Sequence, residues 1–291
     1  MRKLNFALVG QFVLFSGLAG TADALDIQPY DVVPAPAGTA VWTTYIFYGK
    51  SNTAYLNGDE VGGDLKTLSV SQRLTYYFDI MGHPALVTGI VPYVDLRDAN
   101  LAGTPLNDAN GIGDTTLAFT YWLYSDPDTN RHLDMTTYLV VPTGNYEPGD
   151  ALNVGSNRTS YALQLNGAYG LGPQWLLEGS MDVSFYRDNT NSGGGGGILE
   201  QDPTYSAQLW LSYAATPKLS FSAGWGGFWG GEQKLNGVAN GFDSDRQQLR
   251  AAASWWVNPT LQVLGQVNRD LEVNGGFEAD TSFLLRVSKL F

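Results

Sequence analysis

The most constraining feature of the sequence is a repeated alternation of apolar and polar side chains. Segments of roughly ten residues show this alternation, and stretches rich in Gly, Pro, Asn and Asp separate them. In residues 66–78, for example, Leu68 and Val70 share one face, while Thr67 and Ser69 share the other. A period of two residues is that of a β-strand with one apolar face, so the sequence predicts an all-β protein.

We expect about twelve such strands beyond the N-terminal region of the chain. The expected strands are 39–50, 66–79, 85–96, 114–124, 132–142, 158–170, 174–186, 204–214, 218–229, 248–257, 260–268 and 280–291. The even number is informative, because bacterial single-chain membrane barrels contain an even number of antiparallel strands.

The connections between these strands alternate in length. The long connections are 51–65, 97–113, 143–157, 187–203, 230–247 and 269–279, and the short ones are 80–84, 125–131, 171–173, 215–217 and 258–259. Outer-membrane barrels have short periplasmic turns and longer extracellular loops, whereas a soluble sandwich has no reason to alternate in this way. Lipid offers no hydrogen-bond partner to the backbone, so a sheet that crosses the membrane must close on itself. The sequence therefore predicts a closed transmembrane antiparallel β-barrel of about 12 strands.

Composition excludes several classes of function. Of the 291 residues, 15% are charged and 13% are aromatic, and cysteine is absent. The absence of cysteine excludes a disulfide scaffold, thiol catalysis and thiolate zinc sites. The formal net charge of −12 argues against nucleic acid as a partner.

The N-terminal residues have the pattern of a signal peptide. Basic Arg2 and Lys3 precede an apolar stretch at 6–18, and Ala22-Asp23-Ala24 matches an A-x-A cleavage site. The alternative, a membrane anchor, needs about 20 apolar residues, and this stretch is shorter. We therefore expect residues 1–24 to be cleaved during export.

The next segment, residues 25–38, is a Pro-rich N-terminal arm that precedes the barrel at 39–291. Three prolines make it unsuited to the interior of a sheet. Two positions are open: the arm hangs loosely in the periplasm, or it tucks into the mouth of the barrel. We favour the loosely attached periplasmic arm.

Aromatic residues are expected to form a girdle at the periplasmic boundary of the membrane. They lie on the apolar faces of predicted strands, near the ends assigned to the periplasm, where amphipathic rings are favoured. The alternative is that aromatic residues simply favour strands. The expected girdle consists of Tyr76, Phe78, Tyr121, Tyr169, Trp175, Tyr213, Trp255 and Phe291.

The polar faces of the strands are expected to line the lumen. The charged residues with inward parity are Arg73, Asp114, Asp134, Glu178, Asp182, Arg250 and Arg286. These residues either pair across the interior and hold the barrel closed, or line a selective path for a solute. We expect five of them to pair with one another in a constriction: Arg73, Glu178, Asp182, Arg250 and Arg286.

No enzyme or metal motif emerges from the sequence. Both histidines, His83 and His132, fall at predicted periplasmic turns, and the expected mature chain contains no Gly-x-Ser-x-Gly. The segment 126–130 begins like a calcium loop but lacks the later ligands. We therefore expect no catalytic residue, cofactor or metal.

Four motifs resemble those of a known family. Residues 31–39 (DVVPAPAGT) and 111–114 (GIGD) each lead into an aromatic strand, and 142–146 (PTGNY) precedes 153–157 (NVGSN). These resemble the outer-membrane β-barrel family named for the meta-pathway of phenol degradation, over about residues 29–291. The resemblance implies an outer-membrane channel or uptake protein for small hydrophobic or aromatic compounds.

The resemblance and the barrel together imply the partners. The chain is expected to contact the lipid bilayer, lipopolysaccharide and a small-molecule solute. C-terminal Phe291 resembles the signal for the outer-membrane assembly machinery, although Lys289 departs from the alternating pattern. Two alternatives remain open: a channel for polar solutes such as nucleosides or acidic oligosaccharides, and a structural or enzymatic barrel.

The predicted topology can be tested on intact cells. Epitope tags in 51–65 and 187–203 should bind antibody, because these loops are expected outside, whereas a tag in 80–84 should not. The reverse labelling pattern would contradict the predicted orientation.

Overall fold

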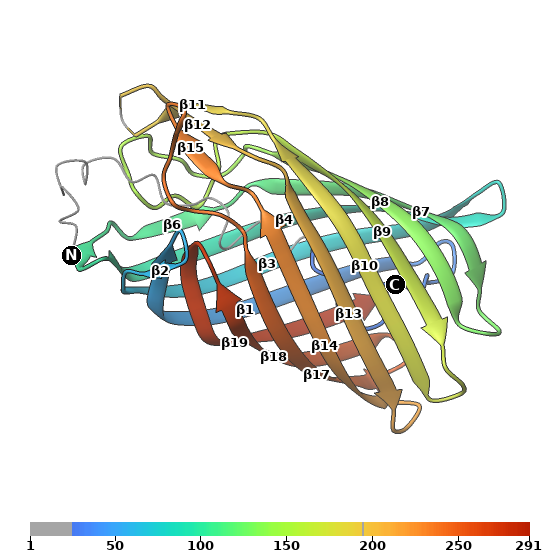
Figure 1. The fold of residues 1–291 in the computed structure, drawn as a ribbon. Helices are drawn as coiled ribbons and strands as arrows, with labels where there is room; N and C mark the ends of the chain where they lie inside the picture. The colour runs from blue at the N-terminus through green and yellow to red at the C-terminus, as the bar shows by residue number, and fades with distance from the viewer. Residues whose placement is uncertain (1–24, 194) are drawn as a thin grey trace.

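The computed structural model describes residues 25–193 and 195–291; the predicted signal peptide lies outside the described residues. Twelve long antiparallel strands form the wall (Figure 1). They are β1 (Ala40–Leu56), β3 (Gly63–Ile80), β4 (His83–Leu101), β7 (Thr115–Asp126), β8 (Arg131–Val141), β9 (Ser160–Gly170), β10 (Trp175–Tyr186), β13 (Thr204–Ala214), β14 (Leu219–Gly230), β17 (Arg246–Asn258), β18 (Leu261–Val273) and β19 (Gly276–Leu290).

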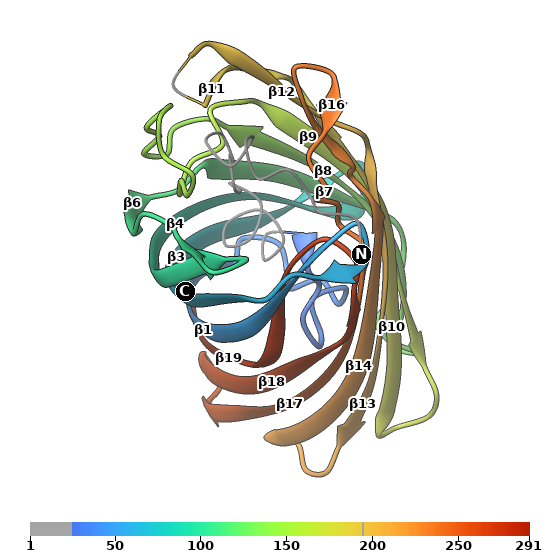
Figure 2. The same cartoon turned by 60° about the vertical axis from the view of Figure 1, so that its left-hand side comes forward.

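The wall closes between its first and last strands. β1 pairs with β19 in an antiparallel register that runs from Val41 opposite Leu290 to Tyr55 opposite Gly276. On its other edge β1 pairs with β3, so no long strand is left with a free edge. The prediction of a closed barrel of twelve strands is confirmed (Figure 2).

The two faces of the wall follow the alternation in the sequence. On the outward face, Leu117 and Leu177 are 47% and 38% exposed, whereas the inward-facing Thr116 and Ser180 on the same two strands are 1% and 4% exposed. No helix among the described residues is long and apolar enough to cross a membrane.

The connections at one end of the barrel, here called the short-turn end, are tight. The turn between β3 and β4 consists of Met81 and Gly82, both with positive φ (52° and 82°), as a two-residue hairpin turn of type I′ requires. The opposite end, here called the loop end, carries the long connections.

At the loop end the strands extend further than the sequence predicted. β1 continues to Leu56 and β18 to Val273, so the expected loops 51–65 and 269–279 are mostly strand. The reason is packing, because the extended hairpins bury Ala54, Leu65 and Phe277 in an apolar cluster. This cluster, the loop-end cluster, consists of Ala54, Leu65, Val94, Leu96, Ala99, Leu101, Leu152, Val154, Phe242 and Phe277.

Short strands complete the loop end. A separate sheet contains β11 (Asn189–Ser192), β12 (Gly197–Gln201), β15 (Gln233–Leu235) and β16 (Val238–Ala239), and it lies beyond the wall (Figures 1 and 2). β2 (Asp59–Glu60), β5 (Thr104–Pro105) and β6 (Ala109–Ile112) extend the edges of β1 and β4. Near this sheet, partial burial raises the pKa of the Asp243 carboxyl, although the N–H of Asp245 donates to it at 3.0 Å. The predicted long loops therefore contain ordered hydrogen-bonded structure.

The lipid-facing parity can be tested at two positions. Leu117→Arg and Leu177→Arg should each lower the free energy of unfolding in lipid by about 2–4 kcal/mol, because the charge would enter hydrocarbon. Leu117→Ala and Leu177→Ala serve as matched controls that keep an apolar side chain. Urea unfolding in phospholipid vesicles measures the difference, and an equal loss in the Arg and Ala variants would contradict the assigned face.

Candidate functional site in the barrel lumen

The N-terminal arm lies inside the barrel. Residues 25–38, in blue, run within the ring of strands (Figure 2). The arm joins β1 at the short-turn end, where the N–H of Gly38 donates to the Tyr77 carbonyl oxygen at 2.8 Å. The expectation of a loosely attached arm is therefore wrong, and the second position, tucked into the barrel, is the observed one. The physical reason is that the lumen supplies partners for both apolar and polar groups of the arm.

Apolar contacts and two indoles hold the arm. Ile27 and Val32 are 5% and 1% exposed and pack with inward-facing Trp210, Leu176 and Leu264. The Trp210 Nε1–H donates to the carbonyl oxygen of Ile27 at 2.9 Å. Trp122 Nε1–H donates in the same way to Val32, also at 2.9 Å. Two buried indoles thus satisfy carbonyl groups that the arm's backbone would otherwise leave without partners.

Glu178 binds the backbone of the arm. Its carboxylate, fully buried in the wall, accepts hydrogen bonds from the N–H groups of Tyr30 at 2.7 Å and Val32 at 3.3 Å. Tyr30 has a φ of 71°, in the left-handed region. The N–H groups of residues 30 and 32 point at this one carboxylate, while the N–H of Asp31 between them donates to the Gln28 carbonyl oxygen at 3.0 Å. The local backbone of the arm is thus shaped around the Glu178 carboxylate.

Two aspartates of the arm form ion pairs with lumen arginines. Asp26 Oδ2 lies 2.9 Å from the Nη2 of Arg250, and Asp31 Oδ1 lies 2.8 Å from the Nη1 of Arg286. The other oxygen of Asp31 lies 3.8 Å from the Nη1 of Arg73. The two carboxylates of the arm therefore face all three predicted lumen arginines, with Asp31 shared between Arg286 and Arg73.

The sequence analysis predicted that charged residues of the wall pair with one another. This prediction is wrong, because they bind other groups. Glu178 binds the arm's backbone, and Asp182 accepts hydrogen bonds from the Ser206 hydroxyl and the Gln164 amide. The wall carboxylates are satisfied by neutral donors, because the arm occupies the space between them and the arginines. Residue parity could not reveal this arrangement.

Asp134 lines a small polar cavity beside the arm. Its carboxylate accepts from the Asn166 amide at 2.7 Å and the Thr136 hydroxyl at 3.2 Å. The cavity has a volume of about 40 Å³, and Asp31, Arg73 and Asp134 are among its lining residues. This volume is enough for a water molecule but not for an aromatic solute, so the arm fills this part of the lumen.

Asp114 stands apart from the central charges, at the loop end. It accepts hydrogen bonds from the N–H of Gly144 at 2.9 Å and of Ser156 at 2.7 Å. A Cβ on Gly144 would lie 2.7 Å from the Cα of Gly155, so these two backbones touch. The motifs at 111–114, 142–146 and 153–157 thus meet at one point, and Asp114 braces a loop there.

Three residues of the site were missed by the sequence analysis: Trp122, Trp210 and Arg158. Both tryptophans are fully buried on inward positions of otherwise polar faces. The sequence did contain a signal for these two residues. A tryptophan at an inward-facing strand position is unusual, because the interior of a membrane barrel is ordinarily polar. Arg158 was expected to begin the strand 158–170, whereas it lies just before β9, which starts at Ser160.

The predicted girdle residues lie on outward or edge positions. Tyr76 and Trp175 are 48% and 44% exposed, and the rings of Trp175 and Tyr213 are 4.7 Å apart. Their location at the membrane boundary stays a prediction.

The histidines lie at the short-turn end. The Nδ1 of His132 lies 2.9 Å from the Ser125 hydroxyl, whereas its Nε2 is buried without a partner. The Nδ1 of His83 contacts the Trp122 carbonyl oxygen at 3.1 Å. Within the described ranges, no three or more His, Asp or Glu side chains form a group that could bind a metal.

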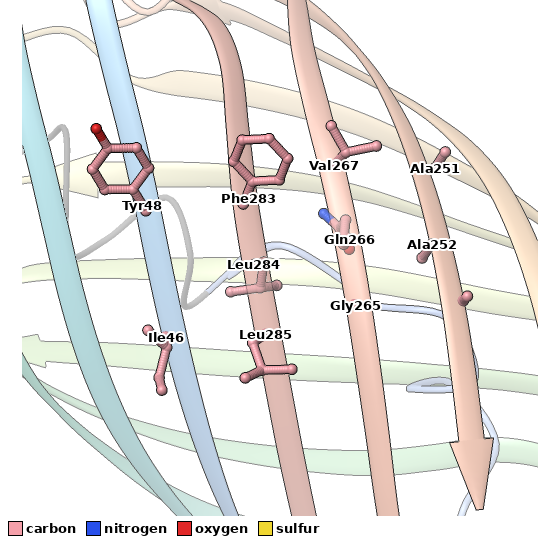
Figure 3. Close-up of a pocket in the computed structure, with 11 residues that line it drawn as sticks. Ile46, Tyr48, Ala251, Ala252, Gly265, Gln266, Val267, Phe283, Leu284 and Leu285 are labelled. Atoms are coloured by element: carbon pink, nitrogen blue, oxygen red, sulfur yellow. The ribbon is translucent and has the colours of Figure 1, made fainter.

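An apolar groove of about 670 Å³ lies on the outside of the wall across β1, β17, β18 and β19 (Figure 3). Small residues, Ala251, Ala253 and Gly265, leave space between the larger Phe283, Leu285 and Tyr48. The parity of these residues is lipid-facing, so we assign the groove to contact with acyl chains and not to the solute path.

Comparisons with known proteins agree with this architecture. A family model described as "Putative MetA-pathway of phenol degradation" matches residues 48–286. The COG4313 outer membrane channel from Pseudomonas putida F1 is 29% identical, with a TM-score of 0.87 over 91% of this chain and 100% of that one. Among curated proteins, none matches the sequence significantly.

More distant structures share the fold alone. The β-domain of the Bordetella autotransporter BrkA is 13% identical, with a TM-score of 0.56 over 87% of this chain and 99% of that one. The transport unit of the autotransporter AIDA-I from Escherichia coli is 10% identical, with a TM-score of 0.53 over 94% and 95%. Together with the COG4313 channel, these structures show that the chain has the fold of an outer-membrane β-barrel.

The contribution of the ion pairs that hold the arm in the lumen can be tested by neutralising the two carboxylates of the arm. The double variant Asp26→Asn/Asp31→Asn should raise the frequency of open-channel events about tenfold, because the arm loses its ion pairs to three arginines. Single-channel recording in planar bilayers measures this frequency. Asp59→Asn, in an exposed strand of the loop end, is the matched control. If the folded double variant stays as silent as the unmodified protein, the ion pairs do not hold the arm.

Proposed function

The chain belongs to the phenol-degradation family of outer-membrane β-barrels, and from this premise we propose that it is a channel for passive uptake of small hydrophobic or aromatic compounds. The proposal extends the family membership and the channel fold to a class of solute. The observation that carries it is a lumen filled by a segment of the chain itself, beneath an apolar loop end.

The filled lumen argues against free diffusion of ions and sugars. Val32 and Ile27 of the arm are packed against the wall, and the described cavity beside them holds about 40 Å³. A solute can cross only if the arm shifts, so transport is expected to be slow and limited to small molecules.

The loop-end cluster favours apolar solutes. Inward-facing Leu65, Leu96 and Phe277 meet Leu152 and Phe242 of the long loops, and all five are at most 4% exposed. A solute that enters at this end has to part these packed apolar side chains, and a sugar would then lose hydration of its hydroxyl groups without gaining hydrogen-bond partners. An apolar solute has no hydroxyl group to desolvate and does not incur this free-energy cost.

A channel for polar solutes is the second candidate. It is favoured by the polar centre of the lumen, where Arg73, Arg250 and Arg286 lie among Gln and Asn side chains. A wide hydrated path would be needed, and the arm occupies the space for it.

We propose that the barrel acts without catalysis, cofactor or metal, and that its N-terminal signal peptide is removed on export. The Ser125 and His132 pair lies at the short-turn end, on the side expected to face the periplasm. An outer-membrane hydrolase would need its nucleophile and base near its lipid substrate.

Uptake measurements test the proposed function. Proteoliposomes with lipopolysaccharide in the outer leaflet should accumulate labelled phenol about tenfold faster than empty vesicles, because the saccharide leaflet slows unaided entry. Steady ion conductance in planar bilayers should be low, since the arm blocks the lumen. A large porin-like conductance without aromatic uptake would move the assignment to the polar-solute channel.

A further inference from the structure

We propose that the channel recognises small aromatic carboxylates, with benzoate as the simplest example, through the lumen arginines, and that Asp26 and Asp31 of the arm occupy these sites in the closed state. The inference rests on the proposed function, because it names one chemical class among small aromatic compounds. It adds a binding site for the carboxylate and a role for the arm as an internal competitor.

The first observation is that the carboxylates opposite the central arginines come from the arm and not from the wall. Arg250 pairs with Asp26, and Arg286 and Arg73 face Asp31, at 2.9, 2.8 and 3.8 Å. The wall's own carboxylates are satisfied by other donors. When the arm moves, the buried guanidinium groups of Arg250 and Arg286 and the partly exposed one of Arg73 lose their counter-charges. This loss is costly for the buried pair unless another anion replaces the arm. The wall is therefore preorganised for a carboxylate that is not part of it.

The second observation is that aromatic side chains accompany the arginines. The guanidinium carbon of Arg250 lies 5.8 Å from the centre of the Phe228 ring, and that of Arg158 lies 4.9 Å from the centre of the Tyr186 ring. The Nη1 of Arg73 donates to the Tyr45 hydroxyl at 3.2 Å. A guanidinium beside a ring offers a charge for a carboxylate and an apolar face for the rest of an aromatic acid.

The third observation is a fourth arginine, at the loop end. Arg158 is 6% exposed, and its Nη2 donates to the Gln201 side-chain oxygen. Its Nη1 is buried without a hydrogen-bond partner. Arg158 is in none of the ion pairs within 4.0 Å that the described ranges contain. A buried donor without a partner is costly, and a carboxylate oxygen would satisfy it.

The nearest acidic groups do not replace such a ligand. The Asp114 carboxylate is engaged by Gly144 and Ser156, and Asp188 acts on Arg158 only at longer range. Arg158 at the loop end therefore has a hydrogen-bond donor, Nη1, without a partner, whereas the central arginines are paired with the arm. An aromatic acid that entered from the loop end would meet Arg158 first and then displace Asp26 and Asp31.

Three probes separate the contributions of charge and ring. Benzoate carries both, benzamide has the ring without the charge, and acetate has the charge without the ring. In vesicles with lipopolysaccharide in the outer leaflet, we expect benzoate uptake to exceed acetate uptake about tenfold. Added benzoate should also raise the open frequency of the unmodified channel in planar bilayers, and benzamide should not. The Asp26→Asn/Asp31→Asn variant should show a high open frequency without benzoate, because its arm no longer competes.

Arg158 is tested by substitution. Arg158→Gln should lower the ratio of benzoate uptake to phenol uptake about tenfold, whereas Arg158→Lys should give an intermediate ratio because it keeps the charge but loses the planar fork. Arg97→Gln, at an exposed arginine that pairs with Asp95, is the matched control. The shift in gel mobility on heating verifies that each variant is folded.

The outcomes distinguish this inference from the proposed function. If phenol enters but benzoate is neither preferred over acetate nor affected by Arg158→Gln, the carboxylate site is overturned and the aromatic channel stands. If neither phenol nor benzoate enters faster than into empty vesicles, the proposed function itself fails. Equal losses of phenol and benzoate uptake in Arg158→Gln would assign Arg158 to the structure of the loop end and would also overturn the inference.

Discussion

A β-sheet in hydrocarbon must leave no backbone N–H or carbonyl group without a partner, and every other feature of this barrel depends on that constraint. The pairing of β1 with β19 completes the wall and leaves no long strand with a free edge. Closure then assigns each residue of a strand to lipid or to the lumen, so Leu117 and Thr116 meet opposite environments although they are neighbours. Closure also creates an enclosed interior, which has to be filled or hydrated.

In the central lumen the protein fills that interior with its own N-terminal arm. The arm brings carboxylates to arginines, N–H groups to Glu178 and apolar side chains to Trp210 and Leu264. These are the pairings that buried charges and buried backbone require. Because none of them is covalent, the same groups that close the lumen can be satisfied by a solute of matching chemistry. The filled barrel is thus compatible with a channel that opens on demand.

The inward faces of the strands have a different role at the loop end from the one they have in the wall. Strands that continue beyond their predicted ends pack their inward faces against one another and against Leu152 and Phe242. Where the sequence predicted long loops at 51–65 and 269–279, these contacts extend the strands instead. Asp114 and the touching glycines Gly144 and Gly155 join the motifs of the family at this end, so the family resemblance is carried by a structural brace.

The sequence by itself determined the class, the strand number, the closed wall and the inward parity of the lumen charges, because a two-residue period and loop lengths are local properties of the chain. The hydrophobic alternation of residues 66–78 needs no partner to be recognised. Only the tertiary structure decided where residues 25–38 lie and which charges meet, since the partners of Asp26 and Asp31 are more than 40 residues away in the sequence. A proline-rich segment carries no periodic signal for its location, and parity says which residues face the lumen but not which of them are in contact. Those contacts exist only once closure of the barrel has brought β3, β10, β17 and β19 around one arm.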